Sequence, residues 1–263
     1  MTTERPRALV TGAAKRLGRA MALYLARRGH DVAIHYASSA AEAEAVAEEA
    51  RSHGVAAVTL PADLTVEAEM QALLPAATDA LGGPLSVLVN NASIFEHDDI
   101  STATRESWDR HLESNLRAPF VLTQGFAAQA PRAVTDDAGE PLARALVVNL
   151  IDQRVHKLTP EFMSYTIAKM GLWAFTRTAA QALAPHVRVN AIGPGPTLQG
   201  ARQTPEHFAR QRAACLLGRG ANADDITAAL GYFLDAPAVT GQMLSLDGGQ
   251  HLVWTTPDVQ GVE

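Results

Sequence analysis

The sequence predicts an α/β domain in which a parallel sheet of about seven strands is covered by helices on both faces. Three observations carry this prediction. Short apolar runs alternate with segments of helical periodicity, a rhythm that requires right-handed crossovers between parallel strands. A glycine turn, Thr11 to Gly18, joins the first apolar run to the first helical segment. The 263 residues, 47% of them hydrophobic, suit one large core, so we expect a single domain over residues 1–263.

The glycine turn reads Thr11-Gly-Ala-Ala-Lys-Arg-Leu-Gly18 and follows the apolar run Ala8-Leu9-Val10. We expect a helix over Arg19–Arg28 after it, ended by Gly29. Such a turn aims backbone N–H groups and the positive end of a helix at one point, and glycine lets a pyrophosphate approach because it has no Cβ. We therefore expect a dinucleotide here and a doubly wound, Rossmann-type sheet, although glycine turns also join strands to helices for packing alone.

The other elements follow from capping residues and breakers. Ser39 and Glu42 have the spacing of a capping box, and Thr159 with Pro160 suits the start of a long helix. Pro119 must kink or split the helix expected over 104–129. We expect further strands at 31–36, 56–60, 86–90, 145–151, 187–192 and 242–246, further helices at 39–53, 66–81, 159–183 and 224–234, an exposed loop at 131–141, a rigid loop at 193–196, a mobile helical flap at 204–217 and a turn at 247–249.

Composition excludes several classes of function. A net charge of −6 argues against a nucleic-acid or anionic-membrane surface, because phosphate binding requires a basic face. Cys215 is the single cysteine and has no metal-ligand pattern around it, so we expect no metal site and a reducing compartment. The first seven residues lack the apolar segment of a signal peptide, and no run approaches the roughly 18 apolar residues of a membrane span. The sequence therefore predicts a cytoplasmic protein.

Tyr165 and Lys169 are four residues apart on the long helix, so both side chains leave the same face one turn apart. An ammonium beside a phenol favours phenolate and is expected to lower the pKa of Tyr165, which suits a proton donor near neutral pH. The alternative is an ordinary pair on a helix surface. Asp152 lies thirteen residues earlier, at the tip of a core strand where parallel sheets present ligands, although an acid there also serves to cap a turn.

Together these residues resemble the short-chain dehydrogenase/reductase family over nearly the whole chain. The family's usual serine is replaced by Asp152, and the middle glycine of its TGxxxGxG turn is replaced by Arg16. Both replacements are similar to those of the pteridine reductase branch, which includes bacterial dihydrofolate and dihydromonapterin reductases. The motifs that carry the resemblance are the glycine turn, His35-Tyr36, Asn90-Asn91-Ala92-Ser93 with Phe95, Asn115, Asp152, Tyr165 with Lys169, Pro194-Gly195 and Asp247-Gly-Gly249.

The resemblance implies hydride transfer from a reduced nicotinamide to a C=N bond of a pterin ring. Tyr165 would supply the proton, and Lys169 would hold the nicotinamide ribose and tune Tyr165. Asp152 would bind the pterin ring or assist its protonation, while Asn115 would hold a water next to Lys169.

Two further residues are expected at the substrate. Phe95 would cover one face of a flat ring, which stacking rewards, although loop packing is the alternative for this residue. Arg16 would lie near both pyrophosphate and substrate, so the expected substrate contacts are Arg16, Phe95, Asp152 and Tyr165. Trp173 and Phe175 are interpreted as core or subunit contacts.

The sequence favours NADP(H) over NAD(H). No acid stands at the end of the second strand, His35-Tyr-Ala-Ser-Ser39, where an NAD site binds the ribose 2′-OH. Lys15, Arg16, Ser38 and Ser39 instead offer donors for a 2′-phosphate. Asp63 resembles the family's adenine contact, or else caps the helix after it. The cofactor site implied by the resemblance consists of Gly12, Lys15, Arg16, Leu17, Gly18, His35, Tyr36, Ser38, Ser39, Asp63, Leu64, Asn91, Ala92, Ser93, Pro194 and Gly195.

Two alternative functions stay open at this point. The first is a reductase of the same family that acts on a carbonyl, such as a 3-oxoacyl thioester or a sugar. The second is a catalytically silent dinucleotide-binding sensor, because function resides in the site and not in the fold. Beyond a small-molecule substrate, the partner that the resemblance implies is a second copy of the chain, in a homo-oligomer that is commonly a tetramer.

Overall fold

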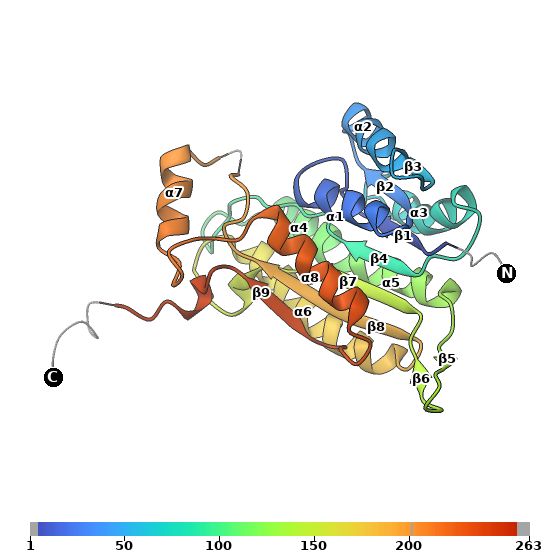
Figure 1. Cartoon of the computed structure of the whole chain (residues 1–263). Helices are drawn as coiled ribbons and strands as arrows, with labels where there is room; N and C mark the ends of the chain where they lie inside the picture. The colour runs from blue at the N-terminus through green and yellow to red at the C-terminus, as the bar shows by residue number, and fades with distance from the viewer. Residues whose placement is uncertain (1–4, 201, 257–263) are drawn as a thin grey trace.

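The computed structural model describes residues 5–200 and 202–256. Within them, seven parallel strands form one sheet in the order β3-β2-β1-β4-β7-β8-β9 (Figure 1). This arrangement confirms the doubly wound α/β prediction. The strands are β1 (Arg7–Val10), β2 (Asp31–Tyr36), β3 (Ala57–Pro61), β4 (Val87–Asn90), β7 (Ala145–Leu150), β8 (Val187–Pro194) and β9 (Met243–Leu246).

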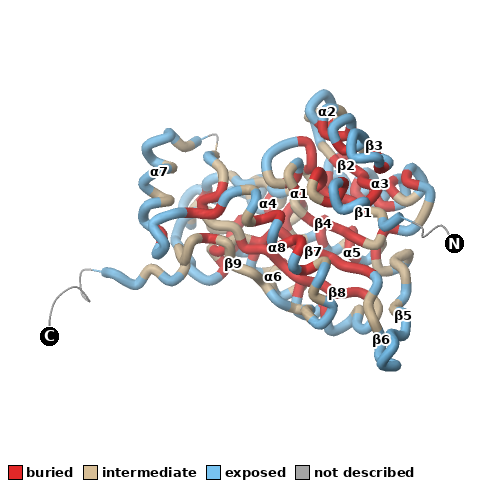
Figure 2. The backbone as a smooth tube through the Cα atoms, viewed as in Figure 1, coloured by how far each residue is buried: buried red, intermediate tan, exposed pale blue. Residues whose placement is uncertain are grey.

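Helices cover both faces of the sheet because successive strand residues point to opposite sides. Ala8 and Val10 pack in one apolar cluster and Leu9 packs in the other. Figure 2 shows the central strands buried between helices whose outer faces are exposed, while the edge strands β3 and β9 are mostly of intermediate burial. The first cluster is covered by α1 (Arg16–Arg27), α2 (Ala40–Arg51) and α8 (Ala223–Asp235), and the second by α3 (Glu67–Ala80), α5 (Ala118–Gln129) and α6 (Met163–Leu183).

The strand order reverses between β1 and β4, which are neighbours in the sheet. Val10, the last residue of β1, lies in register with both Val89 and Ile34. The chain therefore leaves β1 and β4 at the same edge of the sheet, so the glycine turn and Asn91 lie side by side. Open α/β sheets bind ligands at such a switch point. In Figure 1, α7 (Pro205–Ala213) lies at this end, and the small hairpin β5 (Val134–Thr135) and β6 (Pro141–Leu142) projects at the other.

The helix expected over 104–129 is interrupted, as Pro119 predicted. It consists of α4 (Arg105–Leu112), a π-helical turn η1 (Glu113–Arg117) and α5. Thr104 caps α4 in a capping box with Ser107. Pro119 has no N–H for the carbonyl of Asn115, four residues earlier, and the wider turn lies where this bond is missing. Asn115 is thus placed in the irregular turn.

The start of α6 differs from the prediction. The helix begins at Met163, with Phe162 as the preceding residue, and Thr159 does not cap it. Phe162 has a left-handed backbone conformation, with φ +56°, that bulky residues rarely adopt. Thr159 instead accepts a hydrogen bond from the Arg154 guanidinium.

Other local predictions also change. Ser39 precedes α2 but makes no capping bond, and Glu42 pairs with Lys15 (2.7 Å). The stretch 131–141, expected as an exposed loop, is largely exposed, but most of the hairpin β5–β6 lies in it. Strand β8 continues through Gly193 and Pro194, which were expected in a loop. The flap contains α7, capped by Thr204 as Pro205 begins it. Residues 257–263 of the tail lie outside the described residues.

Candidate active site

His35 braces the glycine turn. Gly12 N–H donates to Nδ1 of His35 (2.9 Å), so this nitrogen is an acceptor and the ring proton is on Nε2. Nε2–H then donates to the carbonyl of Ala62 (3.0 Å). The bond from Gly12 requires a neutral imidazole, and burial lowers the pKa of His35 accordingly. His35 therefore fixes the glycine turn relative to the residue that follows β3, Ala62.

Thr11 and Asn91 hold the turn against β4. The Thr11 hydroxyl accepts from the backbone N–H groups of Asn91 and Ala92, at 2.9 Å each. The Asn91 amide donates back to the carbonyls of Thr11 (2.8 Å) and Gly12 (3.1 Å). Thr11 was not among the predicted site residues, although its place at the head of the turn was the signal that would have found it.

A groove of about 410 Å³ opens above this turn, at the switch point of the sheet. Arg16 takes the left-handed conformation (φ +55°) usual for the glycine it replaces. Most of the predicted cofactor residues line the groove: Gly12, Lys15, Arg16, Leu17, Gly18, His35, Asp63, Leu64, Asn91, Ala92 and Ser93. The predicted residues outside its lining are Tyr36, Ser38, Ser39, Pro194 and Gly195.

Asp63 is held in the loop after β3 by its own neighbours. Its carboxylate accepts from the backbone N–H (2.9 Å) and the hydroxyl (2.7 Å) of Thr65, and these bonds lower its pKa. The backbone N–H of Asp63 donates to Glu69 (2.7 Å). Asp63 thus shapes the loop that borders the groove rather than capping α3 directly.

Asp152, Tyr165 and Lys169 meet at the carboxyl end of β7. The Tyr165 hydroxyl donates to Oδ2 of Asp152 (3.0 Å), whose Oδ1 accepts from the backbone of Arg154 (2.8 Å). The Lys169 ammonium donates to the carbonyl of Leu150 (2.8 Å) and lies 5.6 Å from the centre of the Tyr165 ring. The three side chains predicted to carry the chemistry are therefore together.

The predicted effect of Lys169 on Tyr165 is wrong in this structure. Burial and the neighbouring Asp152 carboxylate raise the pKa of Tyr165 well above its ordinary value. Loss of solvent also raises the pKa of Asp152 and lowers that of Lys169 to about 8. The physical reason is that Tyr165 donates its proton toward a carboxylate, while the Lys169 ammonium is engaged by a backbone carbonyl. The Asp152–Tyr165 pair is thus built to retain a proton.

Asn115 clamps the loop that follows β4. Its side chain is fully buried, and its amide accepts from Ile94 N–H (3.0 Å) and donates to the Ile94 carbonyl (2.8 Å). Ile94 immediately precedes Phe95. The side chain of Asn115 therefore fixes the loop that carries the predicted substrate contact, while its role toward a water stays a prediction.

Phe95 lies beside Tyr165, as a substrate-covering residue would, but it is already stacked. Its ring stacks on Phe162 with centroids 4.2 Å apart and lies edge to face with the Tyr165 ring, with centroids 4.7 Å apart. Arg202 lies 5.4 Å from the Phe95 ring centre and donates to the Phe95 carbonyl (2.6 Å). Neither Phe162 nor Arg202 was expected from the sequence. The available signal for Phe162 was its place three residues before Tyr165.

Arg16 joins the glycine turn to the segment before α7. Its guanidinium donates to the carbonyls of Leu198 (3.0 Å) and Gln199 (2.7 Å). Arg202, a few residues further on, contacts Phe95 as described. Arg16 and Arg202 therefore hold this segment over the carboxyl end of the sheet, one beside the groove and one beside Phe95.

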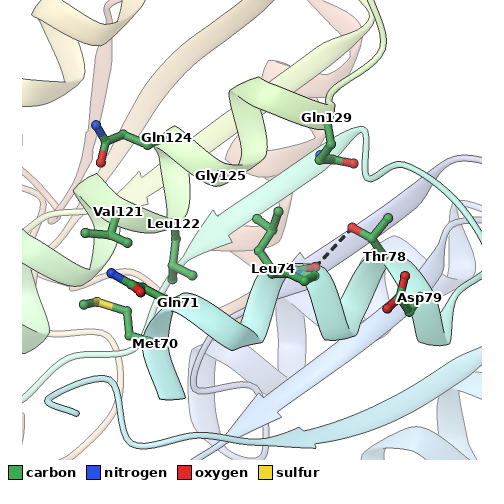
Figure 3. A pocket seen from close by; sticks show the side chains of 11 residues that line it. Met70, Gln71, Leu74, Thr78, Asp79, Val121, Leu122, Gln124, Gly125 and Gln129 are labelled. Atoms are coloured by element: carbon green, nitrogen blue, oxygen red, sulfur yellow. Dashed lines mark hydrogen bonds between the residues drawn. The ribbon is translucent and has the colours of Figure 1, made fainter. Parts of the chain in front are cut away.

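A second hollow, of about 500 Å³, lies between α3 and α5 (Figure 3). It is larger than the groove, but it assembles no pair for proton transfer, since Asp79 is the one charged residue in its lining. Thr78 donates within its own helix, to the Leu74 carbonyl (3.0 Å). The other side chains shown are aliphatic or amides: Met70, Gln71, Val121, Leu122, Gln124 and Gln129.

Residues 5–200 and 202–256 hold neither a side-chain group suited to a metal ion nor a helix suited to span a membrane. No group of three or more His, Cys, Asp or Glu side chains in these ranges is placed to hold a metal ion. No helix in the same ranges is both long and apolar enough to cross a bilayer.

Comparison with known proteins agrees with this geometry. The structure is similar to that of FolM alternative dihydrofolate reductase 1 from Brucella suis in complex with NADP, with a TM-score of 0.89, 44% identity and coverage of 98% of this chain and 100% of that one. The corresponding protein of Brucella canis, also complexed with NADP, gives a TM-score of 0.88 and 44% identity, with 97% of each chain covered.

Sequence comparison reaches further relatives. The 3-oxoacyl-[acyl-carrier-protein] reductase FabG of Staphylococcus aureus is 29% identical over 93% of this chain and 98% of its own length. Residues 12–251 match the sequence model of a family described as Enoyl-(Acyl carrier protein) reductase. With this match and the site geometry above, the chain belongs to the short-chain dehydrogenase/reductase family of oxidoreductases.

Proposed function

We propose that the protein is an NADPH-dependent reductase that transfers a hydride to a C=N bond of a dihydropterin or dihydrofolate. The observation that carries this proposal is the Asp152 carboxyl group bonded to the Tyr165 hydroxyl, beside the Phe95 ring. A carboxylate facing a carbonyl would repel the oxyanion that forms during its reduction. A pterin instead offers ring N–H and amino donors to Asp152 and a flat face to Phe95.

The residues of the groove fit a dinucleotide. Helix α1 has no side-chain cap and no acidic residue in its first turn, so its N-terminal N–H groups are free of internal side-chain partners. Such N–H groups and the helix dipole favour a phosphate. Gly12 would approach it most closely, with Arg16 alongside and Lys169 at the nicotinamide ribose. The Brucella structures hold NADP in chains with the same overall fold, which supports the cofactor assignment.

Bound NADPH would supply the hydride, and this chain supplies the proton. Tyr165 would donate its hydroxyl proton to the nitrogen of the C=N bond. Asp152 accepts the bond from the Tyr165 hydroxyl (3.0 Å) and so orients this proton donor, and the Tyr165 oxygen regains a proton from solvent after turnover. The net addition across the C=N bond is one hydride and one proton. Phe95 and Phe162 hold the ring and limit access of water.

A carbonyl reductase is the second candidate, and the relationship to a 3-oxoacyl-[acyl-carrier-protein] reductase favours it. The two candidates share Tyr165 and Lys169 and differ in what Asp152 faces. Initial rates of NADPH and NADH oxidation with a dihydropterin, dihydrofolate and a 3-oxoacyl thioester separate them. The proposal predicts the highest kcat/KM for NADPH with a dihydropterin or dihydrofolate. A faster reaction with the thioester, or an equal rate with NADH, would contradict it.

The tetramer expected from the family has a candidate surface on α5 and α6. Phe120, Ile167 and Met170 are large apolar residues that remain 42%, 43% and 40% exposed. Burying such side chains between subunits would be favourable. Light scattering after gel filtration should give four times the chain mass of 27.9 kDa, and Ile167→Glu should lower it. A monomer mass for the unmodified chain would rule the assembly out.

A further inference from the structure

A buried network of hydrogen-bonded polar side chains lies next to Tyr165 and takes no part in the chemistry proposed above. Asp98, His111 and Ser164 are 1%, 0% and 1% exposed. They come from three different elements: the loop after β4, helix α4 and the first turn of α6. Buried polar groups are costly unless bonded, and these three are bonded to one another.

The direction of each bond follows from its donors. The backbone N–H of Glu96 donates to Nε2 of His111 (3.1 Å), so the ring proton is on Nδ1. Nδ1–H donates to the Ser164 hydroxyl oxygen (2.7 Å), and the Ser164 hydroxyl in turn donates to the Asp98 carboxylate. The network therefore requires a neutral His111, and burial lowers the pKa of this residue. No side chain of this network is exposed, which excludes Ser164 as a nucleophile toward a substrate that arrives from solvent.

Asp98 also caps α6 from a distance. Its Oδ1 accepts from the backbone N–H of Ser164 (3.2 Å), and its carbonyl accepts from that of Met163 (3.3 Å). Phe162, at the position of the ordinary cap, has no oxygen in its side chain to take this role. A carboxylate at this end is further stabilised by the helix dipole. The first turn of α6, which carries Tyr165, is thus fixed by a residue of another element.

We infer that Asp98, His111 and Ser164 are positioning residues that set Tyr165 relative to Phe95. Ser164 immediately precedes Tyr165, and Glu96, whose N–H binds His111, immediately follows Phe95. The network therefore connects the backbone next to Phe95 with the backbone next to Tyr165, and the ring centroids of these two residues are 4.7 Å apart. This inference rests on the proposed function only in taking Tyr165 as the proton donor. Small misplacements of a reacting group are costly in rate, so the predicted effect is on kcat.

Ser164→Ala tests the inference, because it removes the hydroxyl that both His111 and Asp98 bind. We expect kcat to fall by about 10-fold, with the Kd for NADPH unchanged, and Ser164→Thr to restore most of kcat. Thr176→Val is the matched control. Thr176 is a fully buried hydroxyl on the same helix, bonded to Asn149 (2.9 Å) and Leu172 (2.8 Å), away from Tyr165. It should lower the melting temperature at least as much as Ser164→Ala while retaining kcat.

A double-mutant cycle separates positioning from general destabilisation. If Ser164 acts through Tyr165, Ser164→Ala should have little effect on the residual kcat of Tyr165→Phe, so the two effects are not additive. Additive effects, or a kcat of Ser164→Ala equal to that of Thr176→Val, would overturn the inference. If the wild type reduces a ketone but no dihydropterin, the proposed substrate fails. The same cycle with that ketone then still decides whether Ser164 positions Tyr165.

Discussion

The hydroxyl of Tyr165 donates a hydrogen bond to the carboxyl group of Asp152 over 3.0 Å, where the family's usual residue would present a serine hydroxyl. A serine hydroxyl both donates and accepts, whereas an ionised carboxylate only accepts. Burial raises the pKa of Asp152, and burial together with the Asp152 carboxylate raises the pKa of Tyr165. This relationship links the geometry of the site to the choice of substrate.

Removing the phenol hydroxyl should abolish most turnover. Tyr165→Phe retains the ring that packs against Phe95 but has no proton to donate, so kcat should fall on the order of 10²-fold or more. NADPH binding, measured by fluorescence titration, should be retained. Tyr24→Phe is the control. It removes a phenol hydroxyl on α1 that accepts a hydrogen bond from Arg28 (3.3 Å), and it should leave kcat unchanged. Near-normal turnover of Tyr165→Phe would remove this residue from the mechanism.

The activity should have an alkaline limit set by Lys169. Burial lowers the pKa of Lys169 to about 8, so the ammonium is present below this pH and is lost as the pH rises through it. Because the charge is needed to bind the ribose, kcat/KM should decline above a midpoint near pH 8. Lys169→Arg keeps its charge at every pH tested and should move this limb upward, at a lower maximal rate. A profile of kcat/KM that stays flat from pH 7 to 10 would show that Lys169 does not control it.

The fold should lose stability in mild acid through His35. The folded-state pKa of His35 lies below the unfolded value of 6.5, because burial disfavours the charged ring, and the turn also binds the neutral form. Above pH 6.5 both states are neutral and the contribution is complete. As the pH falls below this value, the unfolded state binds a proton first and the contribution is lost, by up to about 1.4 kcal/mol per pH unit.

Urea unfolding of the wild type and of His35→Asn at about pH 7.5 and 5.5 measures this difference. The wild type should lose more unfolding free energy between the two pH values than His35→Asn does, since other groups contribute equally to both. His53→Asn, at an exposed site beyond α2, should behave like the wild type. Equal losses in the wild type and His35→Asn would mean that the ring is not held neutral by the turn.

The strands and the catalytic spacing could be predicted because their signals are local. Apolar runs such as Ala145–Leu150 indicate buried strands. The four-residue separation of Tyr165 and Lys169 places both side chains on one face of any helix. The glycine turn is also predictable from local sequence, because Gly12 adopts the positive φ that glycine favours. These features depend on neighbours in sequence, and the structure reproduces them.

The features that escaped prediction depend on partners far along the chain. Helix α6 begins at Met163 because Asp98, 66 residues before Ser164, caps it, and no local pattern reports such a cap. The stacking of Phe162 on Phe95 has the same character. The pKa of Tyr165 depends on burial and on Asp152, whereas the spacing to Lys169 alone predicts the opposite direction.

We propose that Asp152 selects a pterin over a carbonyl substrate, and Asp152→Ser tests this proposal most directly. The measurement is kcat/KM with NADPH for a dihydropterin and for a simple ketone, in the wild type and in Asp152→Ser. We predict that the substitution cripples pterin reduction and leaves or raises ketone reduction, while Phe95→Ala weakens pterin binding by about 1 kcal/mol without this reversal. A variant Asp152→Ser that reduces the dihydropterin as well as the wild type does, or a wild type that reduces the ketone faster, would contradict the account.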